Sequence, residues 1–106
     1  MKITTRSAEA LLESIGRTPL IEIEVPQGAR ARLFAKLESV NPGGSIKDRP
    51  VARMMTRALA AGRFERGRRL LDSSSGNAGI AYASIGAALG VPVTLVVPGN
   101  ASRDRR

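Results

Sequence analysis

The sequence predicts an α/β fold, in the form of a parallel, doubly wound, Rossmann-like βαβαβ unit. Short runs at 32–38 and 69–72 and a β-branched run at 93–97 indicate strands, while apolar residues at helical spacing over 47–61 and a largely apolar segment at 78–89 indicate helices. A helix of a dozen or more residues between consecutive strands is the connection that parallel strands require. In such sheets the loops that follow the strands form the ligand-binding edge.

The first crossover helix is predicted to be amphipathic. Its arginines recur at i, i+4 and i+8, and we interpret this stripe as a solvated face. Apolar residues fall on the opposite side. Ser45 and Asp48 form an expected capping pair at its start. The arginines are Arg49, Arg53 and Arg57, and the apolar face comprises Val51, Met54, Met55, Ala58 and Leu59.

The remaining helices and strands are predicted from shorter patterns of apolar residues. Residues 7–14 predict a short amphipathic helix, and 20–24 alternate like a half-buried strand. The helix at 78–89 is apolar on nearly every side, which predicts burial. The β-branched run at 93–97 predicts a strand covered on both faces.

Composition narrows the classes of function that the chain can perform. Its 106 residues suffice for one small domain and include neither cysteine nor histidine. Disulfides, thiolate metal sites, the common zinc sites and Ser-His-Asp catalysis are therefore excluded. The net charge of +8 would suit a polyanion, but aromatic residues make up only 3% of the chain. Because stacking surfaces are nearly absent, we expect no nucleic-acid partner.

The sequence also predicts no membrane partner. No segment approaches the roughly 20 apolar residues of a membrane span. No apolar run follows residues 1–6, as it would in a secretory signal. We therefore expect a cytoplasmic protein.

Lys47 is the first candidate functional residue. It is one of only three lysines, beside Lys2 and Lys36, and it follows the turn-rich segment 41–45 at the start of a predicted helix. The positive end of a helix dipole disfavours a protonated amine. A neutral amine is what covalent attachment of an aldehyde cofactor requires. The alternative is an ordinary surface lysine.

The second candidate is the loop that opens the predicted helix at 78–89. Its sequence at 74–79, Ser-Ser-Gly-Asn-Ala-Gly, offers backbone N–H groups, two hydroxyls and a glycine for close approach. These groups suit a carboxylate or a phosphate. The alternative is an ordinary helix N-cap. Neither this loop nor 43–48 has the spacing of a P-loop or of a G-x-G-x-x-G dinucleotide site.

Three segments, taken in order, resemble the cysteine synthases. They are 15–20 (Ile-Gly-Arg-Thr-Pro-Leu), 41–49 (Asn-Pro-Gly-Gly-Ser-Ile-Lys-Asp-Arg) and 74–80 (Ser-Ser-Gly-Asn-Ala-Gly-Ile). The resemblance runs from about residue 8 to the last residue. It is to the N-terminal part of the cysteine synthase (O-acetylserine sulfhydrylase) and cystathionine β-synthase family of fold-type II pyridoxal-phosphate enzymes.

The resemblance implies roles for individual residues. Lys47 matches the lysine that holds pyridoxal 5′-phosphate covalently and moves protons at the substrate α-carbon. Asn77 matches the asparagine that hydrogen-bonds an oxygen of the cofactor ring. The family commonly has threonine where this chain has Ala78, which leaves the substrate preference open. The implied substrate-binding residues, which clasp the amino-acid carboxylate, are Ser74, Ser75, Gly76, Asn77 and Ala78.

The resemblance also implies a division of the chain. Residues 1–31 would form a helix and strand that join the larger domain of a two-domain fold, and 32–106 would form a partial α/β domain. The phosphate-binding loop of the family, and the serine that faces the ring nitrogen, lie further downstream in its members. We therefore expect this chain alone to be inactive, and the full-length protein to be a homodimer.

The implied activity is β-replacement on an O-activated serine by a sulfur donor, to give cysteine. The substrates would be a small amino acid and that donor, and the leaving group could be acetate or phosphate. Another fold-type II enzyme, such as a threonine synthase or a serine/threonine dehydratase, is a close alternative. A non-catalytic module that binds a small anion or a partner chain is the alternative outside enzymes.

Overall fold

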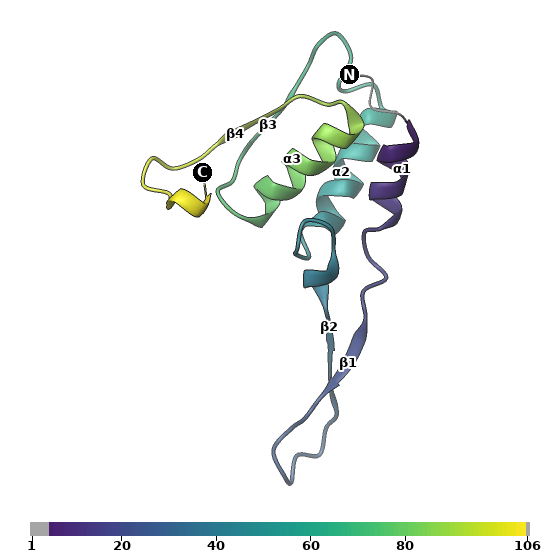
Figure 1. Ribbon diagram of the computed structural model, residues 1–106, viewed down its shortest axis with the longest axis vertical. Helices are drawn as coiled ribbons and strands as arrows, with labels where there is room; N and C mark the ends of the chain where they lie inside the picture. Colours follow the sequence, from purple (N-terminus) through teal and green to yellow (C-terminus); the bar gives the residue numbers. More distant parts are fainter. Residues whose placement is uncertain (1–4, 106) are drawn as a thin grey trace.

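The computed structural model describes residues 5–105, which form three packed helices, a small parallel sheet and a projecting hairpin (Figure 1). Two short 3-10 helices complete the described part of the chain. The elements in order are α1 (Thr5–Glu13), β1 (Leu20–Ile23), β2 (Leu33–Lys36), η1 (Glu38–Val40), α2 (Asp48–Ala60), β3 (Leu70–Ser73), α3 (Asn77–Leu89), β4 (Val93–Val96) and η2 (Arg103–Arg105).

The parallel pair β3 and β4 confirms the α/β class. Leu70 lies opposite Val93 and Ser73 lies opposite Val96, and α3 connects the two strands. Both ends of α3 are encoded locally. The loop 74–76 precedes it, and Gly90 ends it in the left-handed conformation with φ of 68°, which glycine adopts without steric cost.

The strand predicted at 32–38 does not join this parallel sheet. Within the predicted range, residues 33–36 form the strand β2, which pairs antiparallel with β1. In this pairing Leu20 lies opposite Lys36 and Ile23 lies opposite Leu33. The two strands are joined by the loop 24–32, and closing a loop of this length costs little entropy. The resulting hairpin extends away from the helices (Figure 1) and accounts for the elongated shape of 60 × 37 × 23 Å. The division of the chain at residue 31 stays a prediction.

The core lies where α2 and α3 face each other, with α1 packed against α3. Val51 and Met55 of α2 meet Ala81 and Ile85 of α3, and each of these side chains is at most 1% exposed. Residues of α1 and the strands pack around this centre. They include Leu11, Leu12, Ile15, Leu70, Val93 and Leu95.

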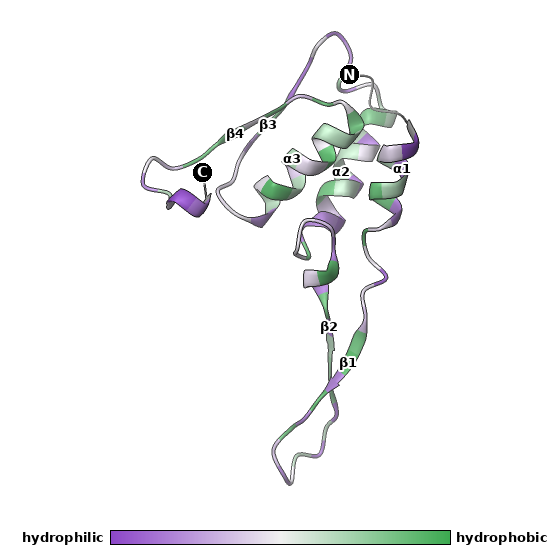
Figure 2. Cartoon of the chain, viewed as in Figure 1, coloured by the Kyte–Doolittle hydropathy of each residue, from purple (hydrophilic) through white to green (hydrophobic). Residues whose placement is uncertain are grey.

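Three predicted buried faces are more open than expected. Met54 and Leu59 on α2 are 49% and 43% exposed, and Ile80 on α3 is 53% exposed. The strand β4 is covered on one face only, since Val96 is 56% exposed. The second face of β4 is open because, among the elements within residues 5–105, α3 is the only helix that packs closely against this strand. Figure 2 shows apolar residues along α2, α3 and β4, with hydrophilic residues gathered in the turn before β3 and in η2.

No helix within the described residues combines the length and the apolar character that crossing a membrane requires.

Candidate functional site

The turn that precedes α2 is held by the side chain of Asn41. This amide is 3% exposed, and its Oδ1 accepts the Gly16 N–H at 2.8 Å. Its Nδ2 donates to the backbone oxygens of Glu38 and Ser45 at 2.9 and 3.0 Å. A turn lacks ladder hydrogen bonds, so a buried amide that satisfies several backbone groups fixes its shape.

Lys47 is the last residue before α2, and its side chain is exposed. Its backbone N–H donates to the Ser45 hydroxyl at 3.1 Å. The amine itself has no hydrogen bond or ion pair to any residue in 5–105. The turn therefore holds the backbone of Lys47 and leaves its side chain free to reach a ligand.

The capping pair predicted between Ser45 and Asp48 is wrong in detail. The Asp48 carboxylate is buried, and its Oδ2 accepts the N–H of Gly43, not that of Ser45, at 2.6 Å. Its Oδ1 is buried without a partner. The position of Gly43 explains this geometry, because a Cβ there would overlap the carboxylate.

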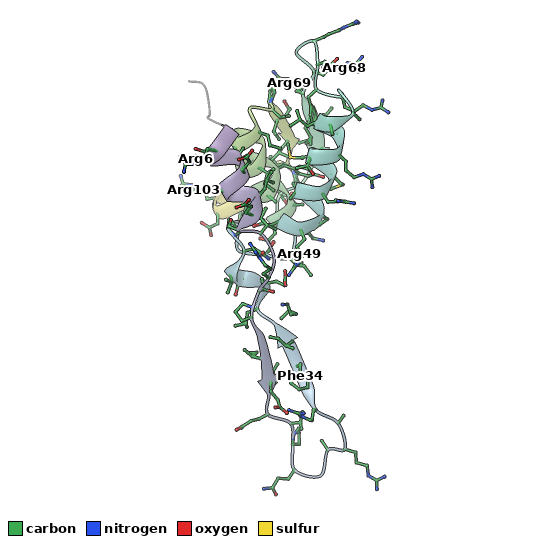
Figure 3. All side chains as sticks on the ribbon, turned by 90° about the vertical axis from the view of Figure 1, so that its right-hand side faces the viewer. Arg6, Phe34, Arg49, Arg68, Arg69 and Arg103 are labelled. Atoms are coloured by element: carbon green, nitrogen blue, oxygen red, sulfur yellow. The ribbon has the colours of Figure 1, made fainter. Side chains whose placement is uncertain are left out.

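A second cluster, which we call the Glu38 network, joins Thr18, Glu38, Asn41 and Arg49. The Arg49 guanidinium contacts Glu38 through two bonds, Nε to Oε2 at 2.7 Å and Nη2 to Oε1 at 2.9 Å. The Thr18 hydroxyl donates to Glu38 Oε1 at 2.6 Å, and Asn41 Nδ2 donates to Oε2 at 2.9 Å. Figure 3 shows Arg49 where the hairpin meets the helices. The sequence pattern predicted that Arg49 lies on a solvated face. Arg49 is exposed, but its guanidinium is bound to Glu38 and is not simply solvated.

The charge on Glu38 is stabilised by these donors. The Arg49 guanidinium, with the Thr18 hydroxyl and the Asn41 amide, lowers the pKa of Glu38 from its ordinary value of 4.5 to about 2, against a smaller opposing effect of burial. Arg49 has a raised pKa for the same reason. The pair thus stays ionised throughout the neutral range.

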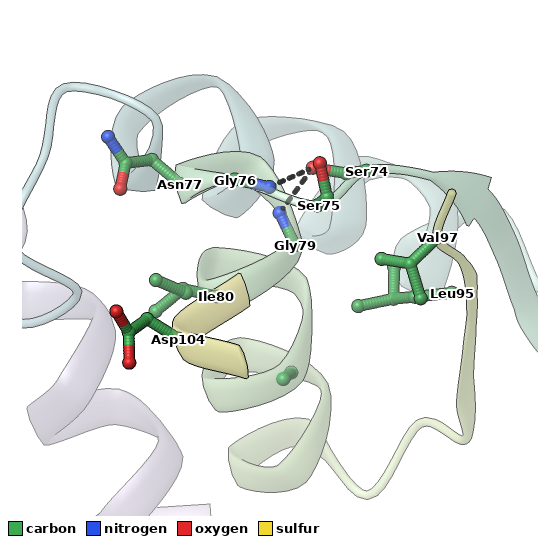
Figure 4. Close-up of a pocket in the computed structure, with 10 residues that line it drawn as sticks. Ser74, Ser75, Gly76, Asn77, Gly79, Ile80, Leu95, Val97 and Asp104 are labelled. Carbon is green, nitrogen blue, oxygen red and sulfur yellow. Dashed lines mark hydrogen bonds between the residues drawn. The ribbon is translucent and has the colours of Figure 1, made fainter. Parts of the chain in front are cut away.

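The loop between β3 and α3 is organised by one hydroxyl. Ser74 Oγ accepts the N–H of Gly79 at 3.0 Å and that of Gly76 at 3.3 Å (Figure 4). Ser74 thus satisfies an N–H of the first turn of α3 from a position two residues before the N-cap, Gly76, which has no side chain to form a capping bond. The backbone N–H groups of Ser75, Asn77 and Ala78 have no hydrogen-bond partner in the described residues.

These free N–H groups lie at the start of α3, beside a cavity of about 710 Å³. That volume falls in the range of small-molecule sites, roughly 300–1,000 Å³. The positive end of the helix dipole and unpaired donors together favour an anion there. The side chains of Ile80, Leu95 and Val97 form apolar walls (Figure 4). The cavity can therefore bind a small ligand with one anionic group.

The structure brings together most of the predicted binding residues. Ser74, Ser75, Gly76 and Asn77 line the same cavity. Ala78 does not line it, because its side chain packs toward the core. Lys47 is not among the lining residues either. Its helix nevertheless runs beside α3, and the first turns of both helices lie at the same end of the helix layer (Figure 1).

Two sets of residues at the site were not predicted from the sequence. Asp104 of η2 lines the cavity near Ile80 (Figure 4), and a lone aspartate at that distance along the chain carries no local signal. Glu38 and Thr18 form the network around Arg49. Thr18 belongs to the segment 15–20 that carries the family resemblance, but no sequence pattern indicates its side-chain partner 20 residues later. No cluster of three potential metal ligands occurs within the described residues.

Comparisons with known proteins agree on one family. The family model described as "Pyridoxal-phosphate dependent enzyme" matches residues 11–106. A cysteine synthase of Aquifex aeolicus is 44% identical over 95% of this chain, and an N-(2-amino-2-carboxyethyl)-L-glutamate synthase of Ralstonia nicotianae is 43% identical over 85%.

A solved structure gives the same result for the fold. The O-acetylserine sulfhydrylase isoform 3 of Entamoeba histolytica superposes with a TM-score of 0.82 at 36% identity, over 90% of this chain. The chain spans about a third of the length of these proteins, namely 32% of the Aquifex enzyme, 27% of the Ralstonia enzyme and 30% of the Entamoeba structure.

Proposed function

The chain belongs to the family of pyridoxal-phosphate-dependent enzymes, and from that premise we propose that it forms the N-terminal part of a cysteine synthase. In this proposal the full protein replaces the β-substituent of an O-activated serine by a sulfur nucleophile. Lys47 and the segment 74–78 are this chain's contribution to the site. The similarity to cysteine synthases, which extends over nearly the whole chain, supports this choice of activity.

The observation that carries the proposal is the start of α3. Unpaired N–H groups of Ser75, Asn77 and Ala78 lie beside a cavity of suitable size. A carboxylate placed there would gain several charge-assisted hydrogen bonds and a favourable helix dipole. An α-amino acid has such a carboxylate one bond from the carbon at which the reaction begins. Binding it by that group would orient the α-carbon.

The available side chains fit pyridoxal phosphate. Lys47 offers an exposed amine that has no partner among residues 5–105, and Asn77 offers an exposed amide beside the cavity. When bound, the cofactor supplies an electron sink for charge that develops at the substrate α-carbon. Lys47 would hold the cofactor, accept the α-proton and return a proton later. Asn77 would donate a hydrogen bond to the ring, and the apolar walls Ile80 and Leu95 would limit access of water.

The substrates and assembly complete the proposal. We infer an O-acetyl or O-phospho serine as the amino-acid substrate and a sulfide-like donor, in a cytoplasmic homodimer. Exposed apolar side chains on the hairpin, such as Leu20, Leu33 and Phe34, support contact with further protein. The Ralstonia relative supports one second candidate, in which an amine of an amino acid takes the place of the sulfur nucleophile.

The carboxylate site can be tested by titrating the chain with O-acetyl-L-serine, with and without pyridoxal phosphate. The readout is the change in the NMR chemical shift of each backbone amide. The proposal predicts the largest shifts at the amides of Ser75, Asn77 and Ala78. The methyl ester of the same amino acid is the matched control, because it lacks the anionic group and should leave these amides unchanged. Equal shifts with acid and ester, or no shifts, would contradict the proposal.

A further inference from the structure

The three segments that meet at Glu38 are far apart in the sequence. Thr18 precedes β1, Glu38 follows β2 after one residue, and Arg49 lies in the first turn of α2. The base of the hairpin is closed by backbone and side-chain bonds as well. Leu37 N–H donates to Pro19 O at 3.0 Å, and the Lys36 amine donates to Thr18 O. The network is therefore the junction between the hairpin and α2.

Lys47 lies inside a stretch whose ends are both tied to this junction. Two residues before it, the Ser45 backbone oxygen accepts from Asn41; two residues after it, Arg49 is held by Glu38. The Lys47 side chain has no partner of its own within residues 5–105. The point from which the side chain of Lys47 starts is therefore set by the backbone of the turn, and that backbone is held by the network.

We propose that the Glu38 network is a positioning device for Lys47, which holds its backbone at the place from which its amine reaches the ligand at the start of α3. The inference rests on the proposed role of Lys47, and it assigns Glu38 and Arg49 as positioning residues that touch neither cofactor nor substrate. Displacement of a reacting group by about 1 Å can cost on the order of a hundredfold in rate. A network that holds the first turn of α2 thus controls the reactivity of Lys47 without sharing in the chemistry.

A merely structural role predicts a different pattern. If the network only stabilised the fold, its loss would lower the melting temperature and leave the relative reactivity of the lysines unchanged in the molecules that stay folded. If it positions Lys47, the reactivity of Lys47 must fall relative to that of Lys2 while the chain is still folded. The ratio of the two reactivities therefore separates the two roles.

The experiment measures this ratio. The chain is treated with limiting pyridoxal phosphate, reduced with borohydride and digested, and the label on Lys47 is divided by the label on Lys2. In Glu38→Gln and Arg49→Met we expect this ratio to fall by at least about tenfold. Arg53→Met is the matched control, since Arg53 lies one turn further along α2, is exposed and forms no ion pair in the described residues. Its ratio should match the wild-type ratio.

The outcomes are distinguishable. A wild-type preference for Lys47 that persists in folded Glu38→Gln and Arg49→Met overturns the positioning role and leaves the proposed role of Lys47 standing. No preference in the wild type overturns both. Should these variants fail to fold, Thr18→Val removes the two hydrogen bonds of the Thr18 hydroxyl, to Glu38 and from Arg49, and leaves the ion pair in place. It should give a smaller fall in the same ratio, and an unchanged ratio would overturn the inference.

Discussion

Two long helices run side by side in this protein, and their first turns are built in different ways. The start of α2 is tied down by side chains from distant segments, with Asn41 and Asp48 only 3% and 2% exposed. The start of α3 is held mainly by one hydroxyl, that of Ser74, and leaves Ser75, Asn77 and Ala78 with unpaired N–H groups. Polar side chains at the start of α2 are thus buried and hydrogen-bonded within the protein, whereas the start of α3 keeps backbone N–H groups that have no partner among the described residues.

The difference fits two kinds of task. The reactive role proposed for Lys47 needs a backbone that does not move, because the turn sets the point from which the side chain reaches. An anion site needs donors that are not already used by the protein. Hydrogen bonds that would satisfy the α3 start internally would also remove its capacity to bind a ligand. The comparison can be tested by matched substitutions at the two helix starts.

The largest expected contrast is between the two asparagines. Asn41→Ala removes an amide that bonds Gly16, Glu38 and Ser45, and it should lower the free energy of unfolding by about 3 kcal/mol because buried partners are left unsatisfied. Asn77→Ala, at an exposed amide, should change it by less than about 0.5 kcal/mol. Urea unfolding of both variants checks this. Similar losses at the two positions would remove the distinction.

A smaller contrast is expected between two glycines. A Cβ at Gly43 would overlap the buried Asp48 carboxylate, whereas no atom lies within 4 Å of a Cβ added at Gly76. We expect Gly43→Ala to lower the free energy of unfolding by about 2 kcal/mol, as overpacking does. Gly76→Ala should be nearly neutral in the same assay. If Gly43→Ala is tolerated equally well, the turn before α2 is not closely packed.

Within the open loop, the two serines should differ. Ser74→Ala removes the acceptor for the Gly79 N–H and should cost about 1 kcal/mol, the usual loss for a helix cap. Ser75→Ala has no such bond to lose and should leave stability unchanged while its backbone N–H still binds the anion. Thermal unfolding monitored by circular dichroism compares them. An equal loss in both variants would show that the hydroxyl of Ser74 has no capping role.

The smallest expected change in stability at neutral pH concerns the ionisation of Glu38, because this group titrates only in acid. Its pKa in the folded chain is lowered to about 2 from 4.5, so its contribution to stability is present above pH 4.5 and is lost as the pH falls toward 2. Glu38→Gln should flatten this part of the acid unfolding curve. The measurement is urea unfolding at a series of pH values in that interval. A wild-type curve with the same slope as the variant would contradict the lowered pKa.

Local signals explain which parts of the fold could be predicted from the sequence. The helices at 47–61 and 78–89 follow from apolar spacing and turn residues, and they appear as Asp48–Ala60 and Asn77–Leu89. Turn residues likewise predict a loop at 73–77, and in the structure β3 ends at Ser73 and α3 begins at Asn77, so that the loop comprises 74–76. Nothing local indicates which strand a β-strand will pair with, and the strand at 32–38 accordingly joined the wrong sheet in the prediction.

The Glu38 network shows most clearly which contacts a sequence pattern does not predict. Periodicity placed Arg49 in a stripe with Arg53 and Arg57, since the three share a helix face. The pairing of Arg49 with Glu38 depends on the return of the chain through η1, and Thr18 reaches the same carboxylate from 20 residues earlier. Side-chain partners at such separations follow from the tertiary fold, and spacing along the chain does not encode them.

The central claim is that Lys47 holds the cofactor, and covalent mapping tests it most directly. The chain is incubated with pyridoxal phosphate, reduced with borohydride and analysed by peptide mass spectrometry, with Lys47→Ala as the control. The account predicts label concentrated on Lys47 in the wild type and only background label in the variant. Equal labelling of Lys2, Lys36 and Lys47, unaffected by unfolding the chain, would contradict it.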